Sequence, residues 1–297
     1  MRVAFAGTAP FAELVLAGLV GGRHAPVVVV TNPDRPRGRH GTSQPPGIKT
    51  AAVTAGLPLL QPERVSDPEA VRALMEHAPD VFVACAYGQI VGDAVLAALP
   101  CVVVHPSPVP RWRGAAPVER ALMAGETTLG VATLKMTAGV DEGPVGDERT
   151  VEVSADADAG EAYRRLAPAA VASLLATLDG MEAGTVRWLP QEGRASYAAK
   201  ITAADRQIDW TRPAAAIADQ VRALAPHIGA VTELLGRRTV VWRARAGEGA
   251  IPARGPDRLV LSTGEGWLEV LELQEEGRRR MSTAEFLRGA GRALAGP

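Results

Sequence analysis

The chain has 297 residues, which is long for one ordinary domain and suits two. Hydrophobic residues make up 47% and charged residues 22%, a composition that excludes a disordered chain. A net charge of −1 excludes a strong overall field toward nucleic acid or membranes, so such contacts would need local patches. Two cysteines, Cys85 and Cys101, exclude a disulfide framework and a cysteine-rich zinc site, and we expect both in the core.

The apolar stretches predict neither a cleaved leader nor a membrane segment. Pro10 and Glu13 interrupt the apolar run at the N-terminus, which argues against a signal peptide. The longest apolar stretch, residues 81–99, contains Gln89 and Asp93. An acid in a spanning helix costs about 2–3 kcal/mol, so a buried strand with a short helix explains this stretch better. We therefore expect a cytoplasmic protein without membrane contacts.

Short apolar strands alternate with helical patterns through roughly the first 180 residues. This alternation is typical of an α/β fold with a Rossmann-like, doubly wound and mostly parallel sheet. The predicted strands cover residues 2–7, 25–31, 57–60, 80–86, 101–105 and 130–136, and the predicted helices cover residues 11–20, 67–79, 92–100 and 159–182.

The pattern changes after the long helix. Residues 184–210 are polar and rich in glycine and alanine, as linkers are. A helix over 213–226 then precedes four short strands, which predict a small OB-like β-barrel. Ser282 and Glu285 form a capping box for a last helix. We expect a catalytic domain at residues 1–185, a linker at 186–205 and a C-terminal domain at 206–297; the four strands cover residues 230–235, 238–246, 258–263 and 266–273.

Charge is divided unevenly along the chain. From Arg206 onward the net charge is +3, and the preceding residues carry −4. An arginine-rich barrel would suit a partner that carries phosphates. A solvated surface with an arginine bias explains the same numbers, so charge alone does not identify the partner.

His105 is the first candidate for chemistry. It ends the predicted strand 101–105 and precedes a proline-rich loop. The carboxyl ends of strands line the ligand crevice in open parallel sheets, and histidine can carry a proton near neutral pH. A structural histidine at a strand end is the alternative.

Asp141 is the second candidate, in the glycine-flanked turn "GVDEGP" at residues 139–144. A carboxylate beside His105 would orient the imidazole and stabilise its charged form. Ordinary turn chemistry also places aspartate between glycines, so the pairing of the two segments carries the argument.

A long polar loop at residues 31–49 carries Arg35, Arg37, Arg39 and Lys49 against one acid. Such loops are often functional, and arginines can bind phosphates, although a solvated loop is the alternative. The segment "FAGTAPFA" after the first strand lacks the glycine spacing of a nucleotide-binding loop. We expect no metal site, because no group of His, Cys, Asp and Glu has ligand spacing.

These segments together resemble the methionyl-tRNA formyltransferase family, which moves a formyl group from 10-formyltetrahydrofolate to the amino group of methionine on initiator tRNA. The resemblance implies a Rossmann-like formyltransferase domain joined by a linker to an OB-like domain, and it covers nearly the whole chain. The block "PRWRGAAP" is specific, and "MSTAEFL" lies in the second domain. The matching stretches are "FAGTAPFA", "PDRPRGR", "AYGQI", "HPSPVPRWRGAAPVERALMAGE", "GVDEGP", "YAAKI", "IDW" and "MSTAEFL".

The resemblance also implies roles for single residues. His105 and Asp141 match the catalytic histidine and aspartate, and we expect a monomer that binds 10-formyltetrahydrofolate and initiator methionyl-tRNA. Arg37 and Arg39 match a loop that enters the acceptor stem, and Lys200 matches a linker lysine near the tRNA. The residues that match folate contacts are Ala86, Tyr87, Gly88, Gln89, Ile90, Ser107, Pro108, Val109 and Pro110.

The chain departs from the family pattern at the chemistry. Val103 stands where the family has an asparagine that donates to the formyl oxygen, and the loss of one such donor costs about 10²–10³-fold in rate. Pro108 removes a backbone donor from the folate wall, Glu142 replaces a small residue, and Gly41 and Thr42 replace a basic pair. We expect reduced activity. A silent tRNA- or folate-binding homologue and another amine formyltransferase are the alternatives.

Overall fold

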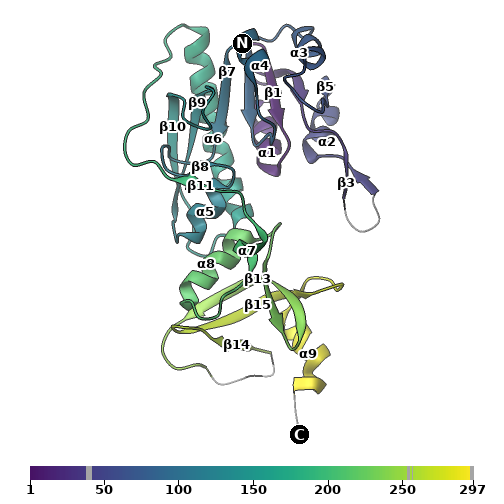
Figure 1. Ribbon diagram of the computed structural model, residues 1–297, viewed down its shortest axis with the longest axis vertical. Coiled ribbons are helices and arrows are strands. Elements are labelled where there is room, and N and C mark those ends of the chain that lie inside the picture. Colours follow the sequence, from purple (N-terminus) through teal and green to yellow (C-terminus); the bar gives the residue numbers. More distant parts are fainter. Residues whose placement is uncertain (38–41, 253–254, 256, 295–297) are drawn as a thin grey trace. The chain divides into compact units, whose positions relative to one another are not determined.

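The computed structural model describes residues 1–37, 42–252, 255 and 257–294 (Figure 1). Its contacts divide the chain into two compact units, and both are discontinuous in sequence. The segments Ala115–Thr127 and Glu152–Ala162 group with the C-terminal unit, although they precede residue 185. The sequence-based division assumed continuous domains and did not foresee this exchange. The first unit comprises Met1–Gly114, Thr128–Val151 and Tyr163–Tyr197, and the second comprises Ala115–Thr127, Glu152–Ala162 and Ala198–Pro297.

The first unit is built on a seven-stranded sheet in the order β10-β9-β7-β6-β1-β2-β5. The five strands from β7 to β5 pair in parallel, and β9 runs antiparallel to β7. This mostly parallel sheet confirms the predicted α/β class. The strands are β1 (Val3–Gly7), β2 (Pro26–Val30), β5 (Leu59–Leu60), β6 (Val81–Cys85), β7 (Cys101–His105), β9 (Thr128–Lys135) and β10 (Val145–Glu152).

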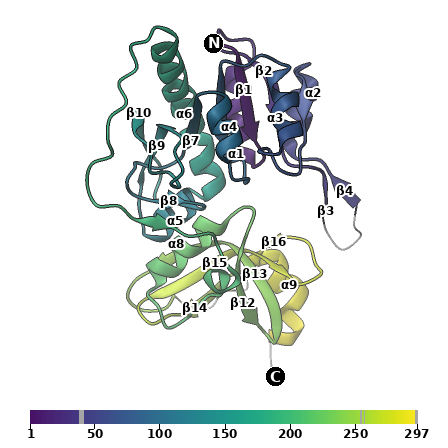
Figure 2. The ribbon, with the colours of Figure 1, turned by 45° about the horizontal axis from the view of Figure 1, so that its top comes forward.

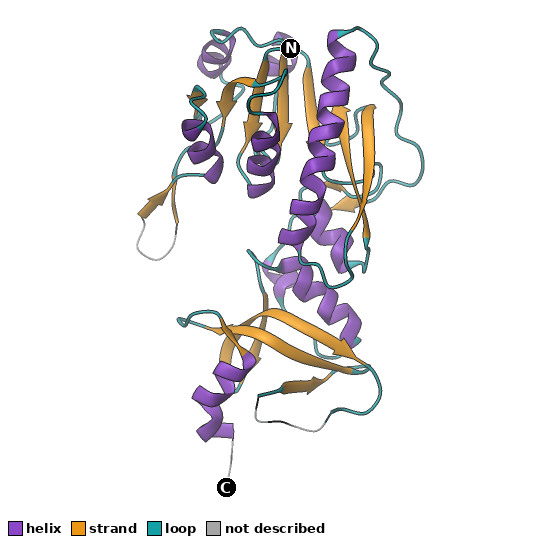
Figure 3. Cartoon of the chain, turned by 180° about the vertical axis from the view of Figure 1, so that it is seen from behind, coloured by secondary structure: helices purple, strands orange, loops and turns teal. Residues whose placement is uncertain are grey.

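Helices cover both faces of this sheet (Figures 2 and 3). On one face, Phe11 of the first helix stacks against Tyr163 of the long helix, with ring centroids 5.2 Å apart. On the other face, alternate strand residues such as Ala4 and Ala6 join a core with Leu74 and Val95. The sheet is therefore doubly wound, by α1 (Pro10–Leu19), α2 (Gly47–Thr54) and α6 (Ala159–Glu182) on the first face and by α3 (Pro68–Met75) and α4 (Asp93–Ala98) on the second.

The second unit contains an antiparallel half-barrel whose strands follow the order β12-β13-β15-β14, with β16 pairing to β15. Its core joins Ile217 and Val221 of one helix to Val241, Leu268 and Val270 of the strands. This confirms the predicted OB-like architecture. The elements are α5 (Pro117–Met123), α7 (Ala203–Arg206), α8 (Ala214–Leu224), β12 (Ala230–Leu234), β13 (Arg237–Gly247), β14 (Leu259–Ser262), β15 (Trp267–Glu275), β16 (Met281–Ser282) and α9 (Thr283–Leu294).

Several elements differ from the sequence-based expectation. The polar loop at residues 31–49 contains a small hairpin of β3 (Arg35–Arg37) and β4 (Thr42–Gln44). Within the expected linker, β11 (Tyr197–Ala198) pairs with β8 (Arg113–Gly114). Among the described residues, no helix combines the length and apolar character that a membrane crossing requires.

Candidate active site

His105 is fixed at the carboxyl end of β7, with only 4% of its surface exposed. Its Nε2 lies 2.9 Å from the backbone oxygen of Trp112. Because a carbonyl oxygen only accepts hydrogen bonds, Nε2 must carry a proton and donate. The other ring nitrogen, Nδ1, is therefore the one that can gain and lose a proton.

Asp141 faces that nitrogen. Its Oδ2 lies 3.5 Å from His105 Nδ1, and its side chain is 13% exposed. The backbone N–H of Gly114 donates to the same oxygen at 2.9 Å. Asp141 has a φ of +52°, a left-handed conformation that is common for aspartate in turns. The structure thus brings together the two residues that the sequence analysis proposed as a pair, 36 positions apart by their numbers.

The segment that follows the proline-rich loop supports both residues. Trp112 supplies the carbonyl that accepts from His105, and Gly114 supplies the N–H for Asp141. Ser196 holds this segment in turn: its Oγ accepts from Trp112 N at 2.9 Å, and its carbonyl accepts from Arg113 N at 3.0 Å. Sequence reasoning missed these groups, because backbone contacts leave no side-chain signature.

The first predicted folate segment, residues 86–90, directly follows β6, the parallel neighbour of β7. Ala86 and Gly88 both have positive φ, and the Ala86 carbonyl accepts from Thr8 N and Ala9 N. Gln89 is tied down, since its Oε1 accepts from Val65 N at 2.8 Å and its Nε2 donates to Asn32 Oδ1 at 2.8 Å. Ile90 is 91% exposed, so this loop presents a bare apolar side chain.

Tyr87 belongs to the same loop, but its side chain enters the core and is 3% exposed. Burial raises the pKa of its phenol, which keeps the hydroxyl neutral. Burial likewise raises the pKa of the Cys101 thiol to about 12, and both cysteines are free and buried. The cysteines therefore fill the core, as predicted.

The second predicted folate segment, residues 107–110, directly follows His105. Ser107 is buried and donates from Oγ to Arg111 O at 2.8 Å. Pro108 lies over β9, where an added Cβ on Gly130 would come within 2.7 Å of Pro108. Val109 packs with Ala132 and Leu134, and the peptide bond to Pro110 is cis. Residues 86–90 and 107–110 thus leave neighbouring strands at the same edge of the sheet.

Val103 lies two residues before His105 on β7. It is partly buried and packs against the cluster of Val109, Ala132 and Leu134. Its neighbours across the strands are Ala84 on β6 and Leu134 on β9. All of these side chains are apolar, so none of them can donate a hydrogen bond at this point of the strand.

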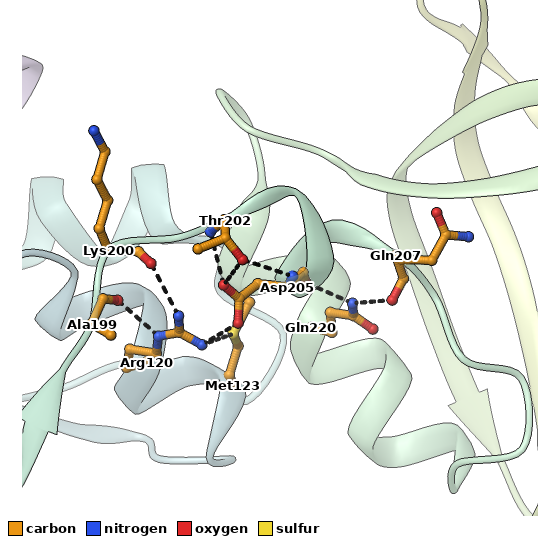
Figure 4. Close-up of polar contacts among 8 residues, drawn as sticks. All are labelled: Arg120, Met123, Ala199, Lys200, Thr202, Asp205, Gln207 and Gln220. Atoms are coloured by element: carbon orange, nitrogen blue, oxygen red, sulfur yellow. Dashed lines mark hydrogen bonds and ion pairs between the residues drawn. The ribbon is translucent and has the colours of Figure 1, made fainter.

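The structure describes two of the three residues that are predicted to contact tRNA. Arg37 ends β3, where it is paired with Thr42, and Arg39 lies outside the described residues. Lys200 is exposed, two residues after β11. Figure 4 shows its side chain directed away from the neighbouring polar cluster, while its backbone carbonyl faces that cluster.

That cluster is centred on Arg120 of α5 and Asp205 of α7, whose Nη1 and Oδ1 atoms lie 2.6 Å apart (Figure 4). Arg120 also donates to the carbonyls of Ala199 at 3.0 Å and Lys200 at 3.3 Å. Asp205 completes a capping box with Thr202. The Arg120 guanidinium and this cap hold the pKa of Asp205 well below its usual range. The cluster fixes the backbone from which Lys200 projects.

Among the described residues, His24, Asp179 and Glu182 lie close enough together to be considered as metal ligands. These side chains are engaged with one another and with neighbouring cations: His24 Nε2 lies 2.9 Å from Asp179 Oδ1, and Glu182 pairs with the N-terminal amine at 2.9 Å. Arg23 pairs with both acids. The group is therefore accounted for as an ion-pair network.

Comparison with known families identifies both parts of the chain. Residues 1–178 match the formyl transferase family, and residues 200–291 match the family of formyl transferase C-terminal domains. The chain is 39% identical to a methionyl-tRNA formyltransferase of Symbiobacterium thermophilum, over 98% of this chain and 93% of the relative. The chain belongs to the methionyl-tRNA formyltransferase family.

Solved structures agree with the fold. Methionyl-tRNA formyltransferase from Clostridium thermocellum aligns with a TM-score of 0.60 at 15% identity, covering 82% of this chain and 93% of that one. HypX from Aquifex aeolicus in complex with tetrahydrofolic acid aligns with a TM-score of 0.68 at 19% identity, covering 100% of this chain and 48% of that one. At these identities the likeness concerns the fold.

Proposed function

We propose that this protein transfers the formyl group of 10-formyltetrahydrofolate to the amino group of initiator methionyl-tRNA. One observation carries the proposal: His105 and Asp141 converge at the carboxyl end of β7, in a chain whose relatives are methionyl-tRNA formyltransferases along nearly their whole length. The reaction needs no electron transfer. It needs a base for the attacking amine and an acid for the folate nitrogen that leaves.

His105 and Asp141 carry the proton in this proposal. The methionine amine attacks the formyl carbon, and a tetrahedral intermediate forms. The amine proton passes to His105 Nδ1, directly or through a water shared with Asp141, because Nε2 is already committed to Trp112 O. The imidazolium then faces the Asp141 carboxylate. When the intermediate collapses, the proton goes to the folate nitrogen, and tetrahydrofolate leaves.

The folate donor is proposed to bind beside this pair, along residues 86–90 and 107–110. The exposed side chain of Ile90 supports this placement, because the flat face of an aromatic or pteridine ring would cover it. The hydrogen bonds from Val65 N to Gln89 and from Ser107 to the Arg111 carbonyl hold the two segments in place. Ala86, Tyr87, Gly88, Val109 and Pro110 complete the proposed wall, and Pro108 stiffens it.

The tRNA is proposed to contact Arg37, Arg39 and Lys200. Lys200 carries an exposed ammonium on a backbone that Arg120 and Asp205 hold in place, which suits a phosphate contact. Residues 1–185 would then act as the catalytic part, 186–205 as the linker and 206–297 as the tRNA-binding part. We further propose that the protein acts as a cytoplasmic monomer, which light scattering after gel filtration would check.

The direct test is a formylation assay with purified protein, 10-formyltetrahydrofolate and methionyl-tRNA. The proposal expects N-formylmethionyl-tRNA, and its absence under single-turnover conditions would overturn the enzyme assignment. Val103 favours the second candidate, a silent homologue that binds tRNA or folate. That candidate expects binding of both substrates without transfer, so a folate titration beside the assay separates the two.

A further inference from the structure

Gln191 connects three segments of the site that are far apart in sequence. It follows α6 in the stretch expected to be only a linker, and both ends of its side-chain amide are used. Its Nε2 donates to the carbonyls of Asp141 and Gly143, each at 2.8 Å. Its Oε1 accepts from Arg113 Nε at 3.0 Å and from Arg113 Nη2 at 2.8 Å.

The amide therefore bonds the backbone of the Asp141 turn at one end and the side chain of Arg113 at the other. Arg113 lies between Trp112, whose carbonyl accepts from His105, and Gly114, whose N–H donates to Asp141. The carbonyl of Asp141 itself is the other end of the bridge. A movement of Gln191 would therefore shift the backbone that carries the Asp141 carboxylate and release the Arg113 side chain.

The Asp141 turn is constrained on both sides. Asp141 has a φ of +52°, in the left-handed region that aspartate enters more readily than most residues with a Cβ atom. Gly143 has no room for a side chain, since a Cβ there would lie 1.8 Å from the Lys135 carbonyl. The turn is therefore tightly packed on β9 at one side and bonded to Gln191 at the other.

We propose that Gln191 is a positioning residue for formyl transfer: it holds Asp141 opposite His105 Nδ1 through the Arg113 segment. The inference rests on the proposed function, because the roles of His105 and Asp141 in transfer belong to that proposal. Gln191 has no part in proton transfer, and it acts through geometry alone.

The test is Gln191→Met, which keeps the length of the side chain and removes both its donor and its acceptor. A misplaced general acid–base pair lowers the chemical step, so kcat should fall by about 10- to 100-fold. The KM values for folate and for methionyl-tRNA should stay within about twofold of wild type. The matched control is Glu192→Ala at the exposed next residue, which should leave both constants unchanged.

A second variant tests the two ends of the Gln191 side-chain amide separately, because its oxygen accepts hydrogen bonds and its nitrogen donates them. Gln191→Glu keeps an acceptor for Arg113 but turns an oxygen toward two carbonyls, so kcat should fall at least as far as in Gln191→Met. In an Asp141→Asn background, Gln191→Met should cause no further loss, because the group that it positions is already inactive. Losses that multiply, or a raised KM at constant kcat, would overturn the inference.

A readout that does not depend on turnover separates this inference from the proposed function. The amide of Gly114 donates to Asp141, so its hydrogen exchange should become at least about tenfold faster in Gln191→Met and stay unchanged in Glu192→Ala. Unchanged exchange in Gln191→Met contradicts the positioning role even in an active enzyme. If exchange is faster but the protein does not formylate methionyl-tRNA, the positioning role of Gln191 is supported and only the proposed function is contradicted.

Discussion

Two clusters of this protein each pair a basic side chain with an aspartate, and they differ in geometry. In the second unit, Arg120 and Asp205 lie 2.6 Å apart, a fully formed ion pair. In the first unit, His105 Nδ1 and Asp141 Oδ2 lie 3.5 Å apart, longer than an ordinary hydrogen bond. The hydrogen bonds that support the pair are shorter: His105 Nε2 lies 2.9 Å from Trp112 O, and Gly114 N lies 2.9 Å from Asp141 Oδ2.

We propose that this difference separates a stabilising cluster from a reactive one. A cluster that only stabilises gains from pairing every charge at short range. A pair that must exchange protons with a substrate gains from firm supports and a relaxed contact between its own members, which a substrate or a water can enter. The predictions below test this distinction in order of expected size.

The largest effect is expected for His105→Ala. Removing the proton carrier should lower kcat/KM for formyl transfer by about 10²–10⁴-fold. Folate affinity, measured by titration, should change little, because the proposed folate wall is formed by neighbouring loops. A variant that keeps more than about a tenth of wild-type activity would show that the proton travels elsewhere.

The next largest effect is expected to be an increase in the rate of formyl transfer. Val103→Asn adds a hydrogen-bond donor at the position that we propose corresponds to the family's asparagine, and should raise single-turnover transfer by about 10²-fold. Val103→Ala serves as its control, since it changes the packing without adding a donor. A gain below about tenfold for the asparagine variant would show that the donor is not what limits this enzyme.

In the stabilising cluster, Arg120→Met should lower the free energy of unfolding by about 1–3 kcal/mol, because it removes charge-assisted hydrogen bonds from a mostly buried pair. Denaturant titration measures this. Arg238→Met, at an exposed pair 3.9 Å from Glu276, should change stability by less than about 0.5 kcal/mol.

The same cluster gives a pH dependence with a defined sign. The pKa of Asp205 is lowered from its ordinary value of 3.8 by the Arg120 guanidinium, so its contribution is present in full above that value. It is lost as the pH falls below about 4 toward the folded-state pKa. The stability gap between wild type and Arg120→Met should therefore be constant near neutral pH and shrink in acid. A gap that widens in acid would contradict this assignment.

The smallest effect is expected for Ser282→Ala at the start of α9. Ser282 Oγ accepts from Glu285 N at 3.3 Å, and Ser282 N donates to Glu285 Oε2 at 2.9 Å. Losing this cap should cost about 1 kcal/mol. Thermal unfolding detects that loss, and Ser282→Thr, which retains a hydroxyl, should recover most of it.

Strong periodicity made much of the fold predictable. The helix expected over 159–182 is observed as Ala159–Glu182, and the capping box at Ser282 is formed as its spacing indicated. The buried parallel strands were evident because their residues are apolar on both faces. β10 was missed, because its partly or fully exposed residues show no apolar alternation.

The site was predictable only in part. His105 and Asp141 could be paired from their segments, and their proximity follows from the fold. Gln191 could not be found, because its amide bonds backbone groups about 50 residues upstream, which no local pattern records. The contact of the Trp112 carbonyl with His105 could not be predicted either, because a backbone contact leaves no side-chain pattern in the sequence.

The most direct test of the central claim is a double-mutant cycle of His105→Ala and Asp141→Asn, read as the single-turnover rate of methionyl-tRNA formylation. If the two residues act as one proton-handling unit, wild type forms N-formylmethionyl-tRNA and the double variant is no slower than the slower single variant. A wild-type protein that forms no product, or losses that multiply in the double variant, would contradict the claim.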